Sequence, residues 1–146
     1  MQEDILSPTA QNKVYKEGSM AIAILLGGPF VVGYLMAHNF RQFGQLEKVR
    51  KTWLYSTFGF LAIAGVMVAV PESLNIPNIV YNLVFAMIAL YFVQKYQGQQ
   101  LKQHIEEGGA VYSNWRAAGI GLLCMLVIVI LLVIFFLLSD AAVLAE

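Results

Sequence analysis

The sequence predicts an all-α, polytopic membrane protein built as a bundle of four transmembrane helices. Residues 117–138 are 22 consecutive residues without a charge, which as a helix would rise about 33 Å and cross a hydrocarbon core of about 30 Å. Across the chain, 59% of the residues are hydrophobic and 12% are charged, a composition typical of integral membrane proteins. The 146 residues leave room for a single membrane domain, 1–146.

The N-terminal part predicts a polar tail followed by the first transmembrane helix. Residues 1–17 are mixed polar, and we expect a short interfacial helix there at most. The apolar stretch 18–37 is longer than the hydrophobic region of a signal peptide, so we predict a retained helix. A proline inside a helix removes a backbone hydrogen bond, so we expect this helix to be kinked near Pro29.

Two more helices are predicted over 53–70 and 77–93. The first ends before Pro71, and the second has Pro77 in its first turn, where a missing N–H costs nothing. Leu101 lies four residues before an isoleucine, which predicts an amphipathic extension of this third helix into water.

The fourth helix is predicted over 117–138. The Gly108-Gly109 pair is a good helix stop before it, and Ser113 or Asn114 can cap its first turn. The polar segments 38–52 and 94–116 are predicted as inner loops.

The distribution of charge predicts that both termini lie outside. In this orientation four basic residues of 38–52 and three of 94–116 lie inside, which is seven of nine, as the positive-inside rule requires. The seven are Arg41, Lys48, Arg50, Lys51, Lys95, Lys102 and Arg116. They either set topology alone or also contact anionic lipid head groups. We expect Trp53, Trp115 and Arg116 to act as interface anchors.

Two tandem helical hairpins would account for the order of the segments. Each half has a helix, a basic loop and a helix that opens near a tryptophan, and residues 43–48 loosely resemble 96–102. The alternative is chance similarity between two polar loops.

Small residues predict where helices pack closely. Ala23 and Gly27 are four residues apart in the first helix, and Ala117 and Gly121 are four apart in the fourth. We therefore expect the inner half of the fourth helix to pack on the bundle and its apolar outer half to face lipid.

Polar residues inside the membrane are the main candidates for function. No Asp, Glu, Lys or Arg lies in the four apolar spans, which disfavours a proton-driven antiporter. Asn78, Tyr81 and Asn82 share one helical face. This face either lines the mouth of a cavity or hydrogen-bonds to neighbouring helices.

A second candidate site lies at the inner boundary. It consists of Tyr34, His38, Asn39 and Arg41, which form either an interfacial anchor or a gate or head-group site. His104 has no second histidine at ligand spacing, and Cys124 is a lone thiol inside an apolar helix, so we expect no metal or other cofactor. No catalytic motif is present, and we expect neither an enzyme nor a nucleic-acid partner.

Several short sequence segments of the chain resemble those of a group of small bacterial four-helix inner-membrane proteins. They are 27–40, Ile76-Pro77, QKYQG at 94–98 and SNWRA at 113–117, and the match spans about residues 22–125. The resemblance implies a bacterial inner membrane, with the outside being the periplasm. It carries no functional residues to this chain.

These observations predict a non-enzymatic accessory or scaffold protein of the lipid bilayer. Its partners would be another membrane protein or anionic head groups. The alternative function is a small channel or solute transporter, formed as a homo-oligomer because four short helices enclose little space.

Overall fold

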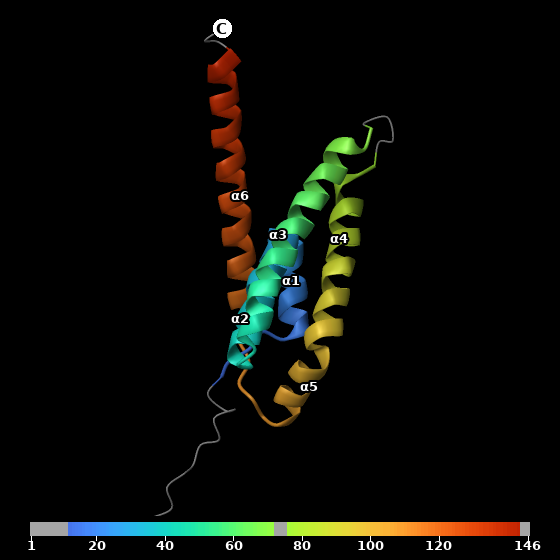
Figure 1. Cartoon of the computed structure of the whole chain (residues 1–146), viewed down its shortest axis with the longest axis vertical. Coiled ribbons are helices and arrows are strands. Elements are labelled where there is room, and N and C mark those ends of the chain that lie inside the picture. The colour runs from blue at the N-terminus through green and yellow to red at the C-terminus, as the bar shows by residue number, and fades with distance from the viewer. Residues whose placement is uncertain (1–11, 72–75, 144–146) are drawn as a thin grey trace, which may run out of the picture.

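The computed structural model describes residues 12–71 and 76–143, and these residues form an all-α fold, as predicted (Figure 1). In chain order the elements are α1 Glu17–Gly27, α2 Pro29–Gln42, α3 Leu46–Ala69, α4 Asn78–Val93, the π-helix η3 Gln94–Gly98, α5 Gln99–Glu106 and α6 Asn114–Val143. Within the described residues, two stretches are long and apolar enough to cross a membrane, namely Ile79–Glu106 and Asn114–Ser139.

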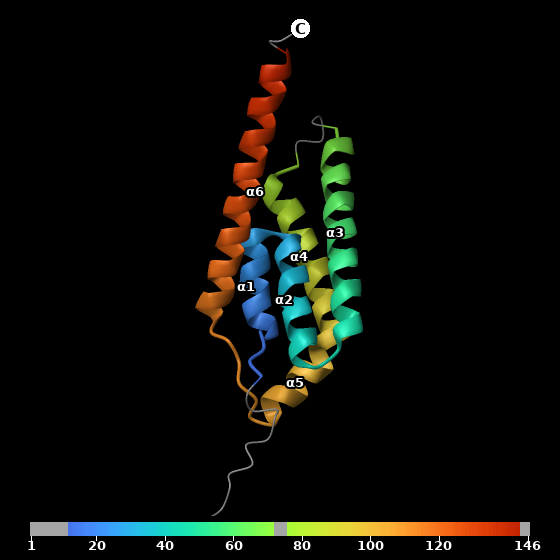
Figure 2. The same cartoon turned by 60° about the vertical axis from the view of Figure 1, so that its left-hand side comes forward.

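The predicted first helix, 18–37, is in fact a helical hairpin. The chain reverses at Gly28, whose φ of 72° lies in a region that L side chains rarely adopt. Pro29 then occupies the first turn of α2, where its fixed φ suits a helix start. Kinking was therefore the wrong expectation, because a glycine directly before the proline allows the helix to end and a new one to begin. Figure 2 shows α1 and α2 side by side and antiparallel.

This hairpin is too short to span a bilayer, and it forms the centre of the fold. With 11 and 14 residues, α1 and α2 rise about 17 and 21 Å. The longer helices pack on it: α6 lies chiefly against α1, α3 lies against α2, and α4 contacts both. The core is therefore built around buried hairpin side chains such as Met20, Ile24 and Leu35. Beyond the hairpin tip, α6 diverges from α3 and α4 in Figure 1.

The expected packing of the inner half of the fourth helix on the bundle is confirmed, and the structure identifies α1 as the helix it contacts. Gly27 of α1 lies directly against Gly121 of α6, so a Cβ on Gly27 would overlap the Gly121 carbonyl. A Cβ on Gly121 would come within 2.8 Å of the Ala23 carbonyl. Gly33 of α2 lies equally close to Ser56 of α3. Glycines thus let the backbones of the long helices approach the hairpin.

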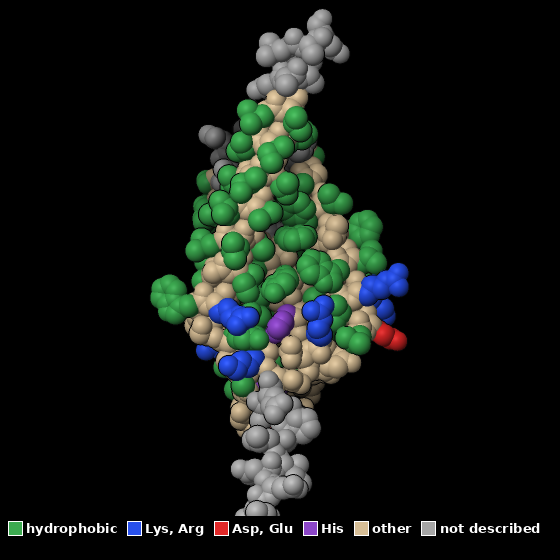
Figure 3. All heavy atoms as spheres, turned by 90° about the vertical axis from the view of Figure 1, so that its left-hand side faces the viewer, with side chains coloured by type: hydrophobic (Ala, Val, Ile, Leu, Met, Phe, Trp, Pro, Cys, Tyr) green, Lys and Arg blue, Asp and Glu red, His purple; other side chains and the backbone are tan. Residues whose placement is uncertain are grey.

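All nine basic residues lie at one end of the molecule. Lys13 and Lys16 precede α1, Arg41 lies in the last turn of α2, and the others lie at the start of α3, in η3 and α5, or at the start of α6. We call this the basic end; Figure 3 shows it below the apolar surface of α6. The N-terminal residues 12–16 therefore lie with the predicted inner loops, contrary to the prediction that both termini share the opposite side. The hairpin causes the difference, because its two helices enter and leave at the same end.

The predicted inner loops are largely helical. α2 and α3 extend into 38–52, leaving a tight turn at Gly44, with a φ of 71°. The helix begun by α4 continues through η3 and α5 to Glu106, which confirms the predicted extension of the third helix. It stops before Gly108, with a φ of 77°, as the Gly-Gly pair predicted.

Ser113 provides the cap of α6. Its Oγ accepts a hydrogen bond from the Arg116 N–H at 3.4 Å, which decides between the two predicted capping residues. The two halves of the chain are not equivalent hairpins, because α2 packs on α3 whereas α1 separates α4 from α6.

We expect Gly27→Ala to lower the free energy of unfolding by about 1–3 kcal/mol, because its Cβ has no space against the backbone of α6. Gly119→Ala is the matched control: it also adds one methyl group in a helix, but nothing lies within 4 Å of it. Helix propensity should make the control neutral or more stable by up to about 1 kcal/mol. Unfolding in detergent micelles measures both, and equal stability of the two variants would contradict the proposed close contact.

Candidate functional site at the basic end

Residues 12–16, which precede α1, are part of the folded core. Val14 forms a parallel β-bridge with Val111, the Val14 N–H donating to the Ala110 carbonyl at 3.2 Å and the Tyr112 N–H to the Val14 carbonyl at 2.9 Å. Val14 and Tyr15 are both buried. The segment before α1 is thereby tied to the connection between α5 and α6.

A buried amide network holds this segment against α2 and η3. Asn39 accepts a hydrogen bond from the Tyr15 N–H at 2.8 Å and donates to the Tyr15 carbonyl at 2.9 Å, as a neighbouring strand would. It also donates to Oε1 of Gln97 at 3.3 Å, and Gln97 donates to the Met36 carbonyl at 2.7 Å. Asn39 and Gln97 are 0% and 1% exposed. Since unpaired buried amides are costly, these four bonds fix the register of three segments.

Gln97 lies within the π-helix η3. A π-helical turn inserts an extra residue into an α-helix and rotates the following side chains. Here the turn lies beside Asn39 on α2, at the point where the Gln97 amide enters the core. A π-helix at a buried polar contact marks a local structural requirement, and we assign that requirement to the Asn39–Gln97 pair.

An aromatic and cationic cluster covers the outside of this network. The Tyr15 ring lies 4.6 Å from Tyr112 and 5.3 Å from His38, measured between ring centres. Arg116 donates from Nε to the Tyr15 hydroxyl at 3.2 Å, and its guanidinium lies 4.2 Å from the centre of the Tyr112 ring. We call Tyr15, His38, Tyr112 and Arg116 the interfacial cluster. It brings together three parts of the chain that are far apart in sequence.

The cluster is positively charged through arginine and not through histidine. Burial lowers the pKa of His38, the hydrogen bond with the Lys13 carbonyl opposes this, and the Arg116 and Arg41 charges lower the pKa further. Since a carbonyl only accepts, the His38 Nε2, at 3.3 Å from the Lys13 oxygen, carries the proton. Burial raises the pKa of Tyr15 in spite of Arg116, so its hydroxyl remains a neutral acceptor for that guanidinium.

The predicted inner-boundary site is divided by the fold. His38 joins the interfacial cluster, and Arg41 is exposed at the end of α2 with its charge acting on His38. Tyr34 is 41% exposed and lies edge-on to Trp53. Asn39 instead points inward and belongs to the buried network, so its role is structural. No local pattern in the sequence indicates Tyr15, Tyr112 or Gln97, because their contacts in this site are to segments far away along the chain.

The predicted polar face of the third helix contributes nothing to this site. Tyr81 is half-buried and Asn82 is exposed on α4, while the side chain of Asn78 lies outside the described part of the chain. Of the expected anchors, Trp115 projects from the start of α6 and is 87% exposed, and Trp53 packs on Phe30 of α2. Both tryptophans lie near the basic end.

Neither His104 nor Cys124 forms a metal site. The His104 ring is buried against Gly109, with Nε2 3.2 Å from the Ala110 carbonyl, so it packs the turn before α6. Cys124 is half-buried on α6. The described residues contain no group of three or more His, Cys, Asp or Glu side chains that could hold a metal ion.

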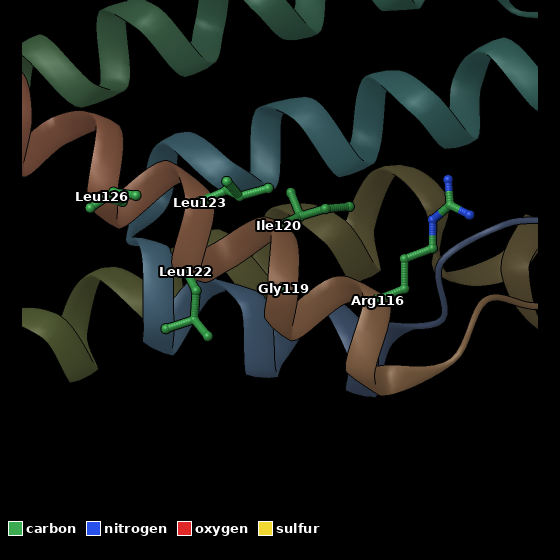
Figure 4. Close-up of a pocket in the computed structure, with 6 residues that line it drawn as sticks. All are labelled: Arg116, Gly119, Ile120, Leu122, Leu123 and Leu126. Carbon is green, nitrogen blue, oxygen red and sulfur yellow. The ribbon is translucent and has the colours of Figure 1, made fainter.

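Two hollows on the surface each combine an arginine with apolar side chains. The first, about 540 Å³, lies along α6 and begins at Arg116 (Figure 4). The second, about 320 Å³, lies along α3 between Arg50 and Phe58. Both are open to the surroundings, so they suit ligands that lie along a helix more than a small solute that must be enclosed.

Comparisons of the chain with protein-family models, with curated proteins and with solved structures found no match. The arrangement at the basic end therefore has to be interpreted from its chemistry. It offers fixed guanidinium donors, aromatic rings and an adjoining apolar surface, which together can hold an anion that carries a hydrocarbon part.

We expect Asn39→Leu to lower the free energy of unfolding by about 2–4 kcal/mol, because it leaves the N–H and carbonyl of Tyr15 and Oε1 of Gln97 without partners in the core. Asn12→Leu is the matched control, since Asn12 also donates to a backbone carbonyl, that of Gln42 at 3.1 Å, but is exposed. The control should change stability by less than about 0.5 kcal/mol. If both variants unfold at the same denaturant concentration, the buried amide network does not stabilise the fold.

Proposed function

We propose that this chain is a multi-pass protein of a bacterial inner membrane that acts as a non-enzymatic scaffold and holds a membrane-spanning segment of a partner protein against its long helices. In this proposal α3, α4 and α6 cross the bilayer, and the extension of α4 through η3 and α5 lies on the cytoplasmic side. The α1–α2 hairpin enters and leaves on that same side. The N-terminus is then inside and the C-terminus outside. This orientation is supported by charge, because it puts all nine basic residues inside, compared with seven for four continuous spans.

The observation that carries the proposal is the uncovered outer half of α6. Every side chain from Val129 to Leu138 exposes at least 47% of its surface. The hairpin ends near Gly28 and so fills only the half of the bundle near the basic end. The outer halves of the long helices therefore lack the central packing that the inner halves have, and a partner's helix would supply it.

Asn82 supports a protein occupant over lipid alone. It is exposed on α4, among apolar neighbours such as Leu83, which is 48% exposed. An amide facing hydrocarbon is costly, whereas asparagine commonly hydrogen-bonds between transmembrane helices. The same observation supports the second candidate, an oligomeric channel or transporter, in which Asn82 would line a pore shared between copies.

The test is native mass spectrometry of the protein released gently from its own membrane. We expect a second polypeptide at fixed stoichiometry with the wild-type chain and with Tyr91→Leu, and its loss with Asn82→Leu. Tyr91 is a suitable control because it is exposed on the same helix, about half a turn away around the axis.

A homo-oligomer alone would contradict the scaffold. If that oligomer also supported solute flux in liposomes, and Asn82→Leu changed the flux, the channel would be the better account. A wild-type chain that is released as a monomer without a partner would contradict both functions.

A further inference from the structure

We propose that the hollow along α6 is a binding site for one anionic phospholipid of the cytoplasmic leaflet. The phosphate of the head group is held by Arg116, and an acyl chain lies along α6. The inference rests on the membrane placement proposed above, but it is independent of the proposed protein partner. It goes beyond general attraction of basic residues to a membrane surface, because it assigns one residue to the head group and one surface to the chain.

The lining of the hollow changes from charged to apolar along α6, which matches a lipid with a charged head group at one end and an apolar acyl chain beyond it. It consists of Arg116, Gly119, Ile120, Leu122, Leu123 and Leu126. Figure 4 shows Ile120 and Leu123 projecting from α6 on the same side as Arg116, while Leu122 projects the other way. From Arg116 to Leu126 the helix rises about 15 Å, which is half of a hydrocarbon core of about 30 Å and hence the depth of one leaflet.

Gly119 creates the space for the chain. A Cβ built on this glycine would meet nothing within 4 Å, so the surface there is open. Gly121, two residues later, is by contrast pressed against α1. Gly121 thus serves the packing of α6 on α1, whereas Gly119 leaves open space on the surface of α6 beside Arg116.

The guanidinium of Arg116 is oriented before any ligand binds. Its Nε donates to the Tyr15 hydroxyl, and its plane lies near the Tyr112 ring. These contacts leave the two terminal nitrogens of the guanidinium, which carry four N–H groups, at its exposed edge. A fork of N–H groups matches the paired oxygens of a phosphate, which makes arginine better suited than a mobile lysine.

The surrounding charge favours an anionic lipid over a zwitterionic one. The charged groups that act on His38, in the middle of the cluster, are Arg116 and Arg41, and both are cations. Figure 3 shows basic side chains on either side of a histidine directly below the apolar surface. A head group with a second, positive charge would lose part of this attraction.

The hollow on α3 has a related design. It is lined by Arg50, Trp53, Leu54, Thr57 and Phe58, again with an arginine at the basic end and apolar side chains beyond. Two helices of the same chain therefore present the same order of groups at the same level, as expected if both face lipid with a common depth.

The experiment titrates the purified full chain with phosphatidylglycerol or with phosphatidylcholine of identical acyl chains, and native mass spectrometry measures bound lipid. We expect phosphatidylglycerol to bind the wild type at least about tenfold more tightly than phosphatidylcholine, and Arg116→Gln to weaken its binding by about tenfold. Lys102→Gln removes a charge at the same end, on α5, outside the hollow, and should bind as the wild type does.

Two further arms separate a lipid site from a simple anion site. Gly119→Leu keeps Arg116 but fills the hollow, so it should also weaken phosphatidylglycerol binding by about tenfold. Soluble glycerol phosphate, which has the head group without the chains, should not compete. Thermal unfolding of each variant checks that the fold is kept, and Arg116→Lys should retain part of the affinity.

Unchanged binding in Arg116→Gln or in Gly119→Leu would overturn the proposal, as would full competition by glycerol phosphate or equal affinity for the two lipids. These results are separable from the test of the scaffold. Loss of lipid binding in Arg116→Gln with no partner protein would contradict the scaffold alone, and a partner complex with no lipid selectivity would contradict the lipid site alone.

Discussion

The reversal of the chain at Gly28 is the constraint on which the rest of this structure depends. A positive φ at this glycine ends α1, and Pro29 starts α2 in the opposite direction, so a stretch long enough to span a membrane becomes a short hairpin. The hairpin then serves as the packing core for three longer helices. It also returns the chain to the end where it entered, which brings residues 12–16 together with the other basic residues of the protein.

The polar contacts at the basic end make this arrangement specific. Small residues allow α1 to approach α6, but this contact exerts no control over the register of residues 12–16. The amides of Asn39 and Gln97 supply that control by pairing with the backbone of Tyr15 and Met36. Tyr15 belongs both to this network, through its backbone, and to the interfacial cluster, through its side chain. The buried network therefore also positions the proposed lipid site. Arg116 is held by the hydroxyl of a tyrosine whose backbone is held by Asn39.

Much of the fold follows from local patterns in the sequence. The uncharged run of α6, the Gly108 stop and the spacing of small residues within α1 and within α6 act through neighbours along one helix or one turn, and they were predicted, with Ser113 as one of two candidate caps. That α6 packs on α1 was not predicted. The hairpin was missed because hydrophobicity continues across Gly28, so length alone indicated a span. The site was predicted only in part. His38 and Arg41 were named from their position at a boundary, whereas Tyr15 and Gln97 act through partners 24 to 101 residues away, which no local pattern reveals.

The side of the membrane on which residues 12–16 lie tests the central claim most directly. In a Cys124→Ala background, the single substitutions Asn12→Cys, Lys102→Cys and Ser139→Cys place a thiol at exposed positions before α1, on α5 and near the end of α6. A membrane-impermeant maleimide applied to bacterial spheroplasts should label only the variant at position 139, and it should label the other two after lysis. Labelling at positions 12 and 139 in intact spheroplasts, with position 102 protected, would show that 18–37 crosses the membrane as one helix and would contradict the hairpin.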